Sequence, residues 1–291
     1  MGDVLSDADL PALWRDLGIP GVIDVHTHFL PEPVMAKVWA YFDAAGDNYG
    51  VDWPITYRWA DDQRLAHLRA MGVRGFTSLV YAHKPGMAQW LSTWSLDFAK
   101  QVPDCLPTAT FYPEPGVDDY VGRSLSAGAR IYKVHLQVSD FDPRDPILDA
   151  VWGALSDAGV PALIHCGSAP LPGRYTGVGP ISDVLRRFPR LPVIIAHLGA
   201  AEFGEFLDIV ASRPLTWLDT TMGLTDFMQA MTPYPPERLP QLRSLSADGK
   251  VLFGSDFPNI PYPYAHQVQV LAEFGLDLRQ VLWEAPNRLF G

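Results

Sequence analysis

The amino-acid sequence predicts a single domain over residues 1–291, with the α/β fold of a (β/α)8 TIM-type barrel. Short apolar runs rich in β-branched residues alternate with amphipathic stretches of helical length, and eight such runs occur. His165 lies 30 residues after His135 and 32 residues before His197, about the length of one strand, one helix and two loops. The chain also exceeds the roughly 250 residues that eight strand–helix units typically need.

Local signals support the order of these elements. The first strand leads into residues 24–28, a run without glycine, whereas an open doubly wound sheet more often has a glycine-rich turn there. Gly159 follows an amphipathic stretch and precedes an apolar run, which suits a left-handed helix C-cap. In chain order, the predicted strands cover residues 21–26, 73–80, 106–111, 129–135, 160–165, 192–197, 215–220 and 250–256.

Residues 29–72 form a connection between the first two predicted strands that is too long for one helix. An insertion after a barrel strand lies on the face that carries the active site. This segment is either a lid or wall for an aromatic or apolar substrate, or a cluster that packs a satellite core or a subunit interface. Its aromatic residues include Trp39, Tyr41, Phe42, Tyr49, Trp53, Tyr57 and Trp59.

The composition is that of a globular protein, with 48% apolar and 19% charged residues. Its 22 basic and 33 acidic residues give a formal net charge of −11. Nucleic acid and anionic membrane surfaces attract basic proteins, so we expect neither as a partner. A small-molecule substrate is the expected partner.

The two cysteines, Cys105 and Cys166, are too few for a disulfide framework or a thiolate zinc site. This usage predicts a reduced, cytoplasmic setting. Residues 1–14 contain three aspartates and lack the basic and apolar regions of a signal peptide. No apolar run approaches the roughly 18–20 residues that cross a bilayer, so we expect no membrane span.

Side chains with metal-ligand chemistry lie at the ends of four predicted strands. His26 and His28 are two residues apart at the end of the first strand, so they share one side of it. His165, His197 and Asp256 end three further strands, and the carboxyl ends of barrel strands converge on one face. A lone histidine pair is typical of ordinary core or surface positions. Together with the other three residues, it predicts a site for a divalent cation such as Zn²⁺.

The segments that carry these residues resemble a known family. They read IDVHTH at residues 23–28, ALIH at 162–165, IIAHLG at 194–199 and LFGSDFP at 252–258, with a closing helix at 281–291. This pattern resembles the amidohydrolase superfamily, in its small-barrel branch related to aminocarboxymuconate-semialdehyde decarboxylase, the amidohydrolase 2 type of metal-dependent hydrolase. The resemblance runs from about residue 21 to the end of the chain. Its motifs match specifically and its loops weakly.

The resemblance implies one divalent metal ion per chain, most often Zn²⁺, although the ligand types also permit Mn, Co or Fe. His26, His28, His165 and Asp256 would be the ligands. Asp256 would also take a proton from zinc-bound water, whose pKa is about 7. His197 would polarise a substrate carbonyl or pass a proton to the leaving group. The alternative for His197 is a hydrogen bond that holds Asp256 or the water.

Lys133 lies two residues before His135 in the fourth predicted strand, so both side chains share one face of it. The favoured interpretation is that Lys133 forms a salt bridge or binds a substrate carboxylate. Two-metal members of the superfamily instead carry a carbamylated lysine on this strand that bridges the metals. A purely structural lysine is the third alternative.

Several loop residues are weaker candidates because they follow predicted strands, where barrel loops face the active site. Arg174 suits a bidentate contact with a substrate carboxylate, or is an ordinary exposed arginine. Cys166 is expected to be structural, because its side chain should point away from that of His165. Glu202 and Glu205 are expected to form a solvated helix face. The candidates for substrate binding are Lys133, His135, Arg174, Tyr175 and His83.

Two reactions fit this set of residues. The first is hydrolysis of an amide, lactone or ester-like bond in a small, aromatic or carboxylated substrate, with Asp256 and His197 as catalytic residues. The second is non-oxidative decarboxylation of a small aromatic or unsaturated acid, for which aromatic side chains would supply flat apolar walls. A barrel that binds metal or ligand without turnover is a third, less favoured alternative. The resemblance is also compatible with a homodimer.

Overall fold

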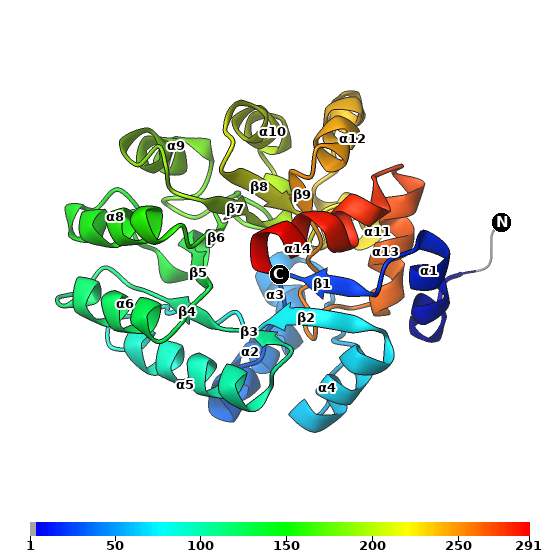
Figure 1. The fold of residues 1–291 in the computed structure, drawn as a ribbon, viewed down its shortest axis with the longest axis horizontal. Coiled ribbons are helices and arrows are strands. Elements are labelled where there is room, and N and C mark those ends of the chain that lie inside the picture. Colours follow the sequence, from blue (N-terminus) through cyan, green and yellow to red (C-terminus); the bar gives the residue numbers. More distant parts are fainter. Residues whose placement is uncertain (1–3) are drawn as a thin grey trace. The chain divides into compact units, whose positions relative to one another are not determined.

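Parallel strands followed by helices make up the computed structural model, which describes residues 4–291 (Figure 1). The first three residues of the 1–14 segment lie outside the described residues. The chain separates into two compact units: the described part of Met1–Thr77 with Thr220–Gly291, and Ser78–Asp219. We describe each unit by itself. The assignment of residues 1–291 to one domain remains a prediction.

The unit Ser78–Asp219 is built on parallel strands that pair in chain order. Tyr132 pairs with Ala162, and His135 lies directly opposite His165. This register places two of the predicted site residues at the same level of the sheet. The strands are β3 (Cys105–Leu106), β4 (Thr108–Thr110), β5 (Ile131–His135), β6 (Ala162–His165), β7 (Val193–Ile195) and β8 (Thr216–Asp219), of which β4 to β8 pair successively.

Amphipathic helices connect these strands. In the helix Val178–Arg187, Ile181, Val184 and Leu185 are buried, at the three- and four-residue spacing that forms one helical face. Gly159 ends the helix before β6 at φ 65°, which confirms the predicted left-handed C-cap. The helices are α5 (Ala88–Gln101), α6 (Val117–Ser126), α7 (Leu136–Ser139), η2 (Pro146–Leu148), α8 (Asp149–Ala158), α9 (Val178–Arg187), η3 (Ala196–Gly199) and α10 (Phe203–Ser212) (Figure 1).

The other unit contains β1 (Val22–Asp24), β2 (Val73–Thr77) and β9 (Val251–Leu252). Strands β1 and β2 pair in parallel, and beyond β1 a single bridge joins Thr27 to Phe257. Its helices are η1 (Asp7–Asp9), α1 (Leu10–Leu17), α2 (Glu32–Asp43), α3 (Ala45–Tyr49), α4 (Asp61–Ala70), α11 (Asp226–Met231), η4 (Pro236–Arg238), α12 (Leu239–Ala247), α13 (Tyr264–Glu273), η5 (Gln280–Glu284) and α14 (Ala285–Phe290).

Each of the eight predicted strand ranges contains an observed strand, although the observed strands are shorter. The third range overlaps two strands, β3 and β4, which are separated at Pro107, a residue without an N–H to donate to a ladder. His197 and Asp256 were each predicted to end a strand, and both predictions are wrong. Strand β9 stops at Leu252, and Asp256 has a φ of 68°. Strand β7 stops at Ile195, and His197 lies in the η3 turn with a φ of 56°, incompatible with a strand.

The connection over residues 29–72 contains α2, α3 and α4. Trp53 and Tyr57 are buried within it, whereas Tyr41 and Trp59 are exposed. Within residues 4–291, no helix combines the length and the apolar character needed to cross a membrane.

Candidate functional site

His26 and His28 lie just beyond β1, in a segment held by backbone hydrogen bonds. The N–H of His28 donates to the carbonyl of Phe257 over 2.7 Å, and the N–H of Asp256 donates to the carbonyl of His26 over 2.8 Å. The two imidazole rings are 5.3 Å apart between centroids, and both residues are buried. The two-residue spacing therefore places both rings together, as expected for side chains on one side of an extended segment.

Asp256 brings a carboxylate to this histidine pair. Its Oδ1 lies 2.9 Å from Nε2 of His28 and 3.4 Å from Nε2 of His26. Asp256 has a φ of 68°, a left-handed backbone conformation that few non-glycine residues adopt. Two imidazole nitrogens and a carboxylate oxygen that converge in a largely buried setting fit the ligand chemistry of a divalent cation.

Asp24 is a buried carboxylate behind this group that the sequence analysis did not single out. Its Oδ1 accepts hydrogen bonds from the N–H groups of His26 and Ser255, each over 3.1 Å. Its Oδ2 accepts from the hydroxyls of Ser255 and Tyr264, over 2.6 and 2.8 Å. Complete burial raises the pKa of Asp24 to about 7, although these four hydrogen bonds lower it. In the sequence, the position of Asp24 two residues before His26 could have indicated its role.

In the unit Ser78–Asp219, the ring of His165 contacts the rings of two other histidines. The ring of His165 stacks on that of His135 with centroids 4.0 Å apart, and the centroid of His197 is 4.6 Å away on a tilted ring. Nε2 of His165 lies 3.1 Å from the carbonyl oxygen of Ala169. A carbonyl only accepts, so this contact assigns the proton to Nε2 and leaves Nδ1 with the lone pair. Of the two ring nitrogens, neutral His165 therefore offers Nδ1 to a ligand.

His197 is oriented through its backbone. Its N–H donates to Oδ1 of Asp219 over 2.9 Å, at the end of β8. This hydrogen bond accompanies the left-handed backbone at His197 and Leu198. The structure thus places His197 beside His165 by a turn rather than by a strand.

Lys133 is buried on β5, with 1% of its surface exposed. A buried lysine is rare unless it has a partner or a function, so its location is consistent with each of the three alternatives from the sequence. His135, two residues later, packs against Tyr81 with ring centroids 5.1 Å apart. The role of Lys133 remains a prediction.

The other candidates for substrate binding lie in loops. Arg174 is exposed and contacts its neighbour Tyr175, with Nη1 3.3 Å from the phenol oxygen and a cation–π distance of 5.5 Å. His83 is also exposed. Burial raises the pKa of the Cys166 thiol, which disfavours the reactive thiolate and agrees with the structural assignment.

Glu202 corrects a sequence expectation. It was expected on a solvated helix face with Glu205. Instead, its carboxylate accepts hydrogen bonds from the amide of Ser168 over 3.0 Å and from the hydroxyl of Ser168 over 2.5 Å. Glu205 is exposed as expected. Glu202 therefore connects the start of α10 to the loop after β6, the loop that carries Ala169. Helical spacing in the sequence does not reveal a contact between segments so far apart in the chain.

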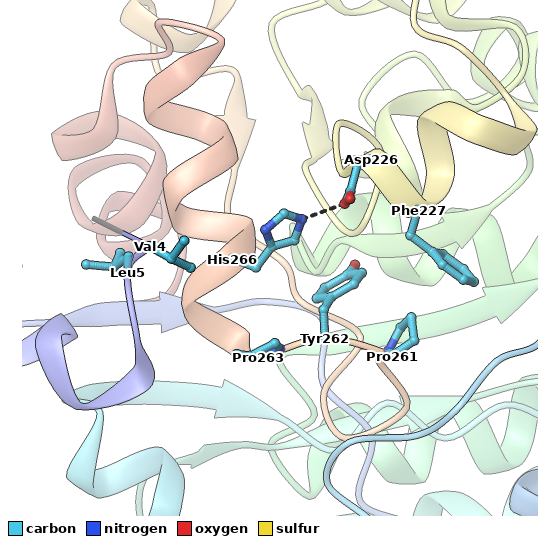
Figure 2. Close-up of a pocket in the computed structure, with 8 residues that line it drawn as sticks. All are labelled: Val4, Leu5, Asp226, Phe227, Pro261, Tyr262, Pro263 and His266. Carbon is cyan, nitrogen blue, oxygen red and sulfur yellow. Dashed lines mark hydrogen bonds and ion pairs between the residues drawn. The ribbon is translucent and has the colours of Figure 1, made fainter. Parts of the chain in front are cut away.

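A cavity of about 370 Å³ in the unit with β1 was also not predicted (Figure 2). Nε2 of His266 and Oδ1 of Asp226 are 2.8 Å apart at its edge. Its walls are mostly apolar, which suits a small ring or an alkyl group more than a highly charged ligand. The lining residues are Val4, Leu5, Asp226, Phe227, Pro261, Tyr262, Pro263 and His266.

Comparisons with known proteins bear on this arrangement. A family model described as Amidohydrolase matches residues 23–291. Among curated proteins, no sequence matches the chain significantly. An uncharacterized TIM-barrel protein from Bordetella bronchiseptica is structurally similar, with a TM-score of 0.74 and 16% sequence identity, over 92% of this chain and 97% of that one.

Two further solved structures share the fold. A protein from Pseudomonas putida provisionally named 2-pyrone-4,6-dicarboxylic acid hydrolase has a TM-score of 0.60 at 17% identity, over 94% of this chain and 98% of that one. A 5-carboxyvanillate decarboxylase from Novosphingobium aromaticivorans, complexed with manganese and 4-hydroxy-3-methoxy-5-nitrobenzoic acid, has a TM-score of 0.59 at 14% identity, over 94% and 97%. The (β/α)8 barrel fold is thereby confirmed. The aromatic insertion after the first strand remains a prediction.

Proposed function

The chain belongs to the amidohydrolase family, and on this premise we propose that it is a metal-dependent hydrolase of small amide, lactone or ester-like substrates. The observation that carries the proposal is the carboxylate oxygen of Asp256 at 2.9 Å from Nε2 of His28 and 3.4 Å from Nε2 of His26. Imidazole nitrogens and carboxylate oxygens are common metal ligands, and here the carboxylate lies more than 200 residues along the chain from the two histidines.

His26, His28, His165 and Asp256 are the proposed ligands of one divalent ion. The barrel fold supports this set, because the carboxyl ends of its strands meet on one face. Zn²⁺ is the first choice, and Mn²⁺ is the alternative suggested by the manganese in the related decarboxylase. When bound, the ion supplies Lewis acidity, which polarises a substrate carbonyl and makes water more acidic.

The side chains then have distinct tasks. Asp256 accepts the proton of the attacking water and returns it to the leaving group. His197 donates a hydrogen bond to the substrate carbonyl oxygen as negative charge develops there. Asp24 holds the backbone of both His26 and Ser255, and so keeps the ligand-bearing segments together.

Substrate binding is assigned to residues at and beyond the strand ends. Buried Lys133 is the proposed partner of a substrate carboxylate, with His135 on the same strand face. Arg174, Tyr175 and His83 are proposed to contact the substrate from their loops. A small aromatic or carboxylated molecule suits these cationic and aromatic groups.

Decarboxylation of a small aromatic or unsaturated acid is the second candidate. The related 5-carboxyvanillate decarboxylase, complexed with manganese and a nitrobenzoic acid, favours it. The same residues would serve this reaction, with Lys133 near the carboxylate. A proton taken up from solvent would add to the carbon that carries the carboxylate, and the bond from that carbon to the carboxylate would then break to release CO₂. A cytoplasmic location and a homodimer belong to the proposal for either reaction.

The first test is the metal content of tag-free protein purified without chelators, measured by elemental mass spectrometry. One zinc or manganese ion per chain supports the proposed site. Two ions per chain would favour a carbamylated Lys133 that bridges them. Absence of metal, with none taken up on incubation, would overturn the proposal.

The second test separates the two reactions. The metal-loaded protein is assayed against a panel of lactones, amides, esters and aromatic acids, with CO₂ and free acid both quantified. Formation of a hydrolysed acid without CO₂ supports the hydrolase. Stoichiometric CO₂ release would replace it with the decarboxylase.

A further inference from the structure

The connection over residues 29–72 contacts the loop that carries Asp256. The indole N–H of Trp39, from α2, donates to Oδ1 of Asn259 over 3.1 Å. The indole N–H of Trp53, in the chain after α3, donates to the backbone carbonyl of Asn259 over 2.8 Å. Asn259 is buried, with 4% of its surface exposed. Two tryptophans therefore hold both the side chain and the main chain of one residue.

Asn259 is in turn linked to Asp256. Its N–H donates to the carbonyl of Asp256 over 2.8 Å and closes a turn, while the N–H of Asp256 donates to the carbonyl of His26. Asp256 adopts a φ of 68°, and a non-glycine residue keeps such a backbone only where its surroundings enforce it. The two backbone hydrogen bonds, one on each side of Asp256, supply that enforcement.

We propose that Trp39 and Trp53 act through Asn259 as positioning residues for the carboxylate of Asp256. This inference rests on the proposed function, in which Asp256 is a metal ligand and a base. Partners outside the first coordination sphere commonly orient metal ligands, and their loss weakens metal affinity by about 10–100-fold. The segment 29–72 then has a role besides a lid or a local core.

Ring packing is the competing explanation for Trp53. Its ring lies 5.0 Å from that of Phe42 and 4.7 Å from that of Phe227, which lines the cavity in Figure 2. A packing role requires only an apolar ring, whereas the positioning role requires the indole N–H. Replacement by phenylalanine retains an aromatic ring and removes the donor, so it separates the two roles. The replacement also leaves the Oδ1 and backbone carbonyl oxygens of buried Asn259 without the indole N–H groups that donate to them.

The experiment uses W39F, W53F and the double variant of the full chain, with W90F as the matched control. Trp90 is exposed on α5, and it lies more than 60 residues along the chain from each of the proposed metal ligands. Each protein is loaded with Co²⁺, and its visible absorption spectrum, its Co²⁺ dissociation constant and its melting temperature without metal are measured. The Co²⁺ spectrum reports ligand geometry and requires no substrate.

We expect the double variant to remain folded, to bind Co²⁺ about tenfold or more weakly and to show a changed spectrum. The single variants should lie between it and the unaltered protein, and W90F should match the unaltered protein. A double variant with an unchanged spectrum and dissociation constant would overturn the positioning role. Failure of the unaltered protein to bind Co²⁺ would instead overturn the proposed function, and this inference with it.

Discussion

The carboxylate of Asp24 accepts hydrogen bonds from both the backbone N–H and the hydroxyl of Ser255, at 3.1 and 2.6 Å, across 231 residues of sequence. Ser255 precedes Asp256, and Asp24 also accepts from the N–H of His26. One buried side chain thus holds the two segments that bring His26 and Asp256 together. Disturbing this carboxylate should affect both stability and the site.

Replacement of Asp256 by asparagine should reduce kcat by about 100- to 10,000-fold, because an amide neither accepts the transferred proton nor carries the charge. Steady-state kinetics on the substrate identified by the panel measures this effect. Asp118→Asn, an exposed change on α6, is the control and should match the unaltered enzyme. A kcat for Asp256→Asn within a factor of a few of normal would contradict the role of this carboxylate.

Ser255→Ala should destabilise the metal-free protein more at pH 8 than at pH 5. Burial raises the folded-state pKa of Asp24 to about 7 from 3.8. Asp24 is therefore largely protonated in the folded protein at pH 5. Its titration lowers stability as the pH rises from about 4 to about 7, and this effect levels off once the folded protein is ionised as well. At pH 8 the variant loses a hydrogen bond to a charged group, about 1.5–3 kcal/mol, against about 0.5–1.5 kcal/mol for a neutral one at pH 5.

Urea unfolding in the presence of a chelator, at both pH values, provides the comparison. The Ser255 hydroxyl also accepts from the N–H of Phe257, and loss of this contact adds a cost that does not depend on pH. Ser139→Ala is the control, because the Ser139 hydroxyl donates to the neutral carbonyl of Ala82. Equal destabilisation by Ser255→Ala at pH 5 and pH 8 would mean that Asp24 keeps one charge state throughout this range.

Glu202→Gln should lower the free energy of unfolding by about 1–3 kcal/mol, since one carboxylate oxygen that accepts from Ser168 becomes an amide group that only donates. Glu205→Gln, on the same helix and exposed, should change it by less than about 0.5 kcal/mol. Chemical denaturation at pH 7 measures both variants. If Glu202→Gln and Glu205→Gln had the same free energy of unfolding, Glu202 would not contribute to holding the loop that carries Ala169.

Removal of the metal by a chelator should abolish activity, and its return should raise the melting temperature. A ligand present at 100 times its dissociation constant stabilises a folded protein by about 2.7 kcal/mol. His28→Ala should show a smaller rise at the same Zn²⁺ concentration, because it lacks one proposed ligand. His266→Ala, a histidine outside the proposed ligand set, should show the full rise. Differential scanning fluorimetry with and without Zn²⁺ distinguishes these cases.

Local patterns were sufficient for the strand–helix order and for the proximity of His26 and His28. Apolar periodicity marked the strands, since burial of one face depends on residues only a few positions apart. The two-residue spacing likewise put His26 and His28 on one side of an extended segment. The strand predicted over residues 160–165 placed His165 at a strand end, and His165 does lie at the end of β6.

Contacts between distant segments were beyond these patterns. The left-handed backbones of His197 and Asp256 are tied to hydrogen bonds with Asp219 and His26, and local propensity favours an ordinary backbone at both residues. Glu202 resembles any exposed helical glutamate until Ser168 is placed beside it. The sequence therefore determined which residue types follow the strands, because periodicity is local. The tertiary structure decided how they are oriented, because partners more than 20 residues away in the chain complete their hydrogen bonds.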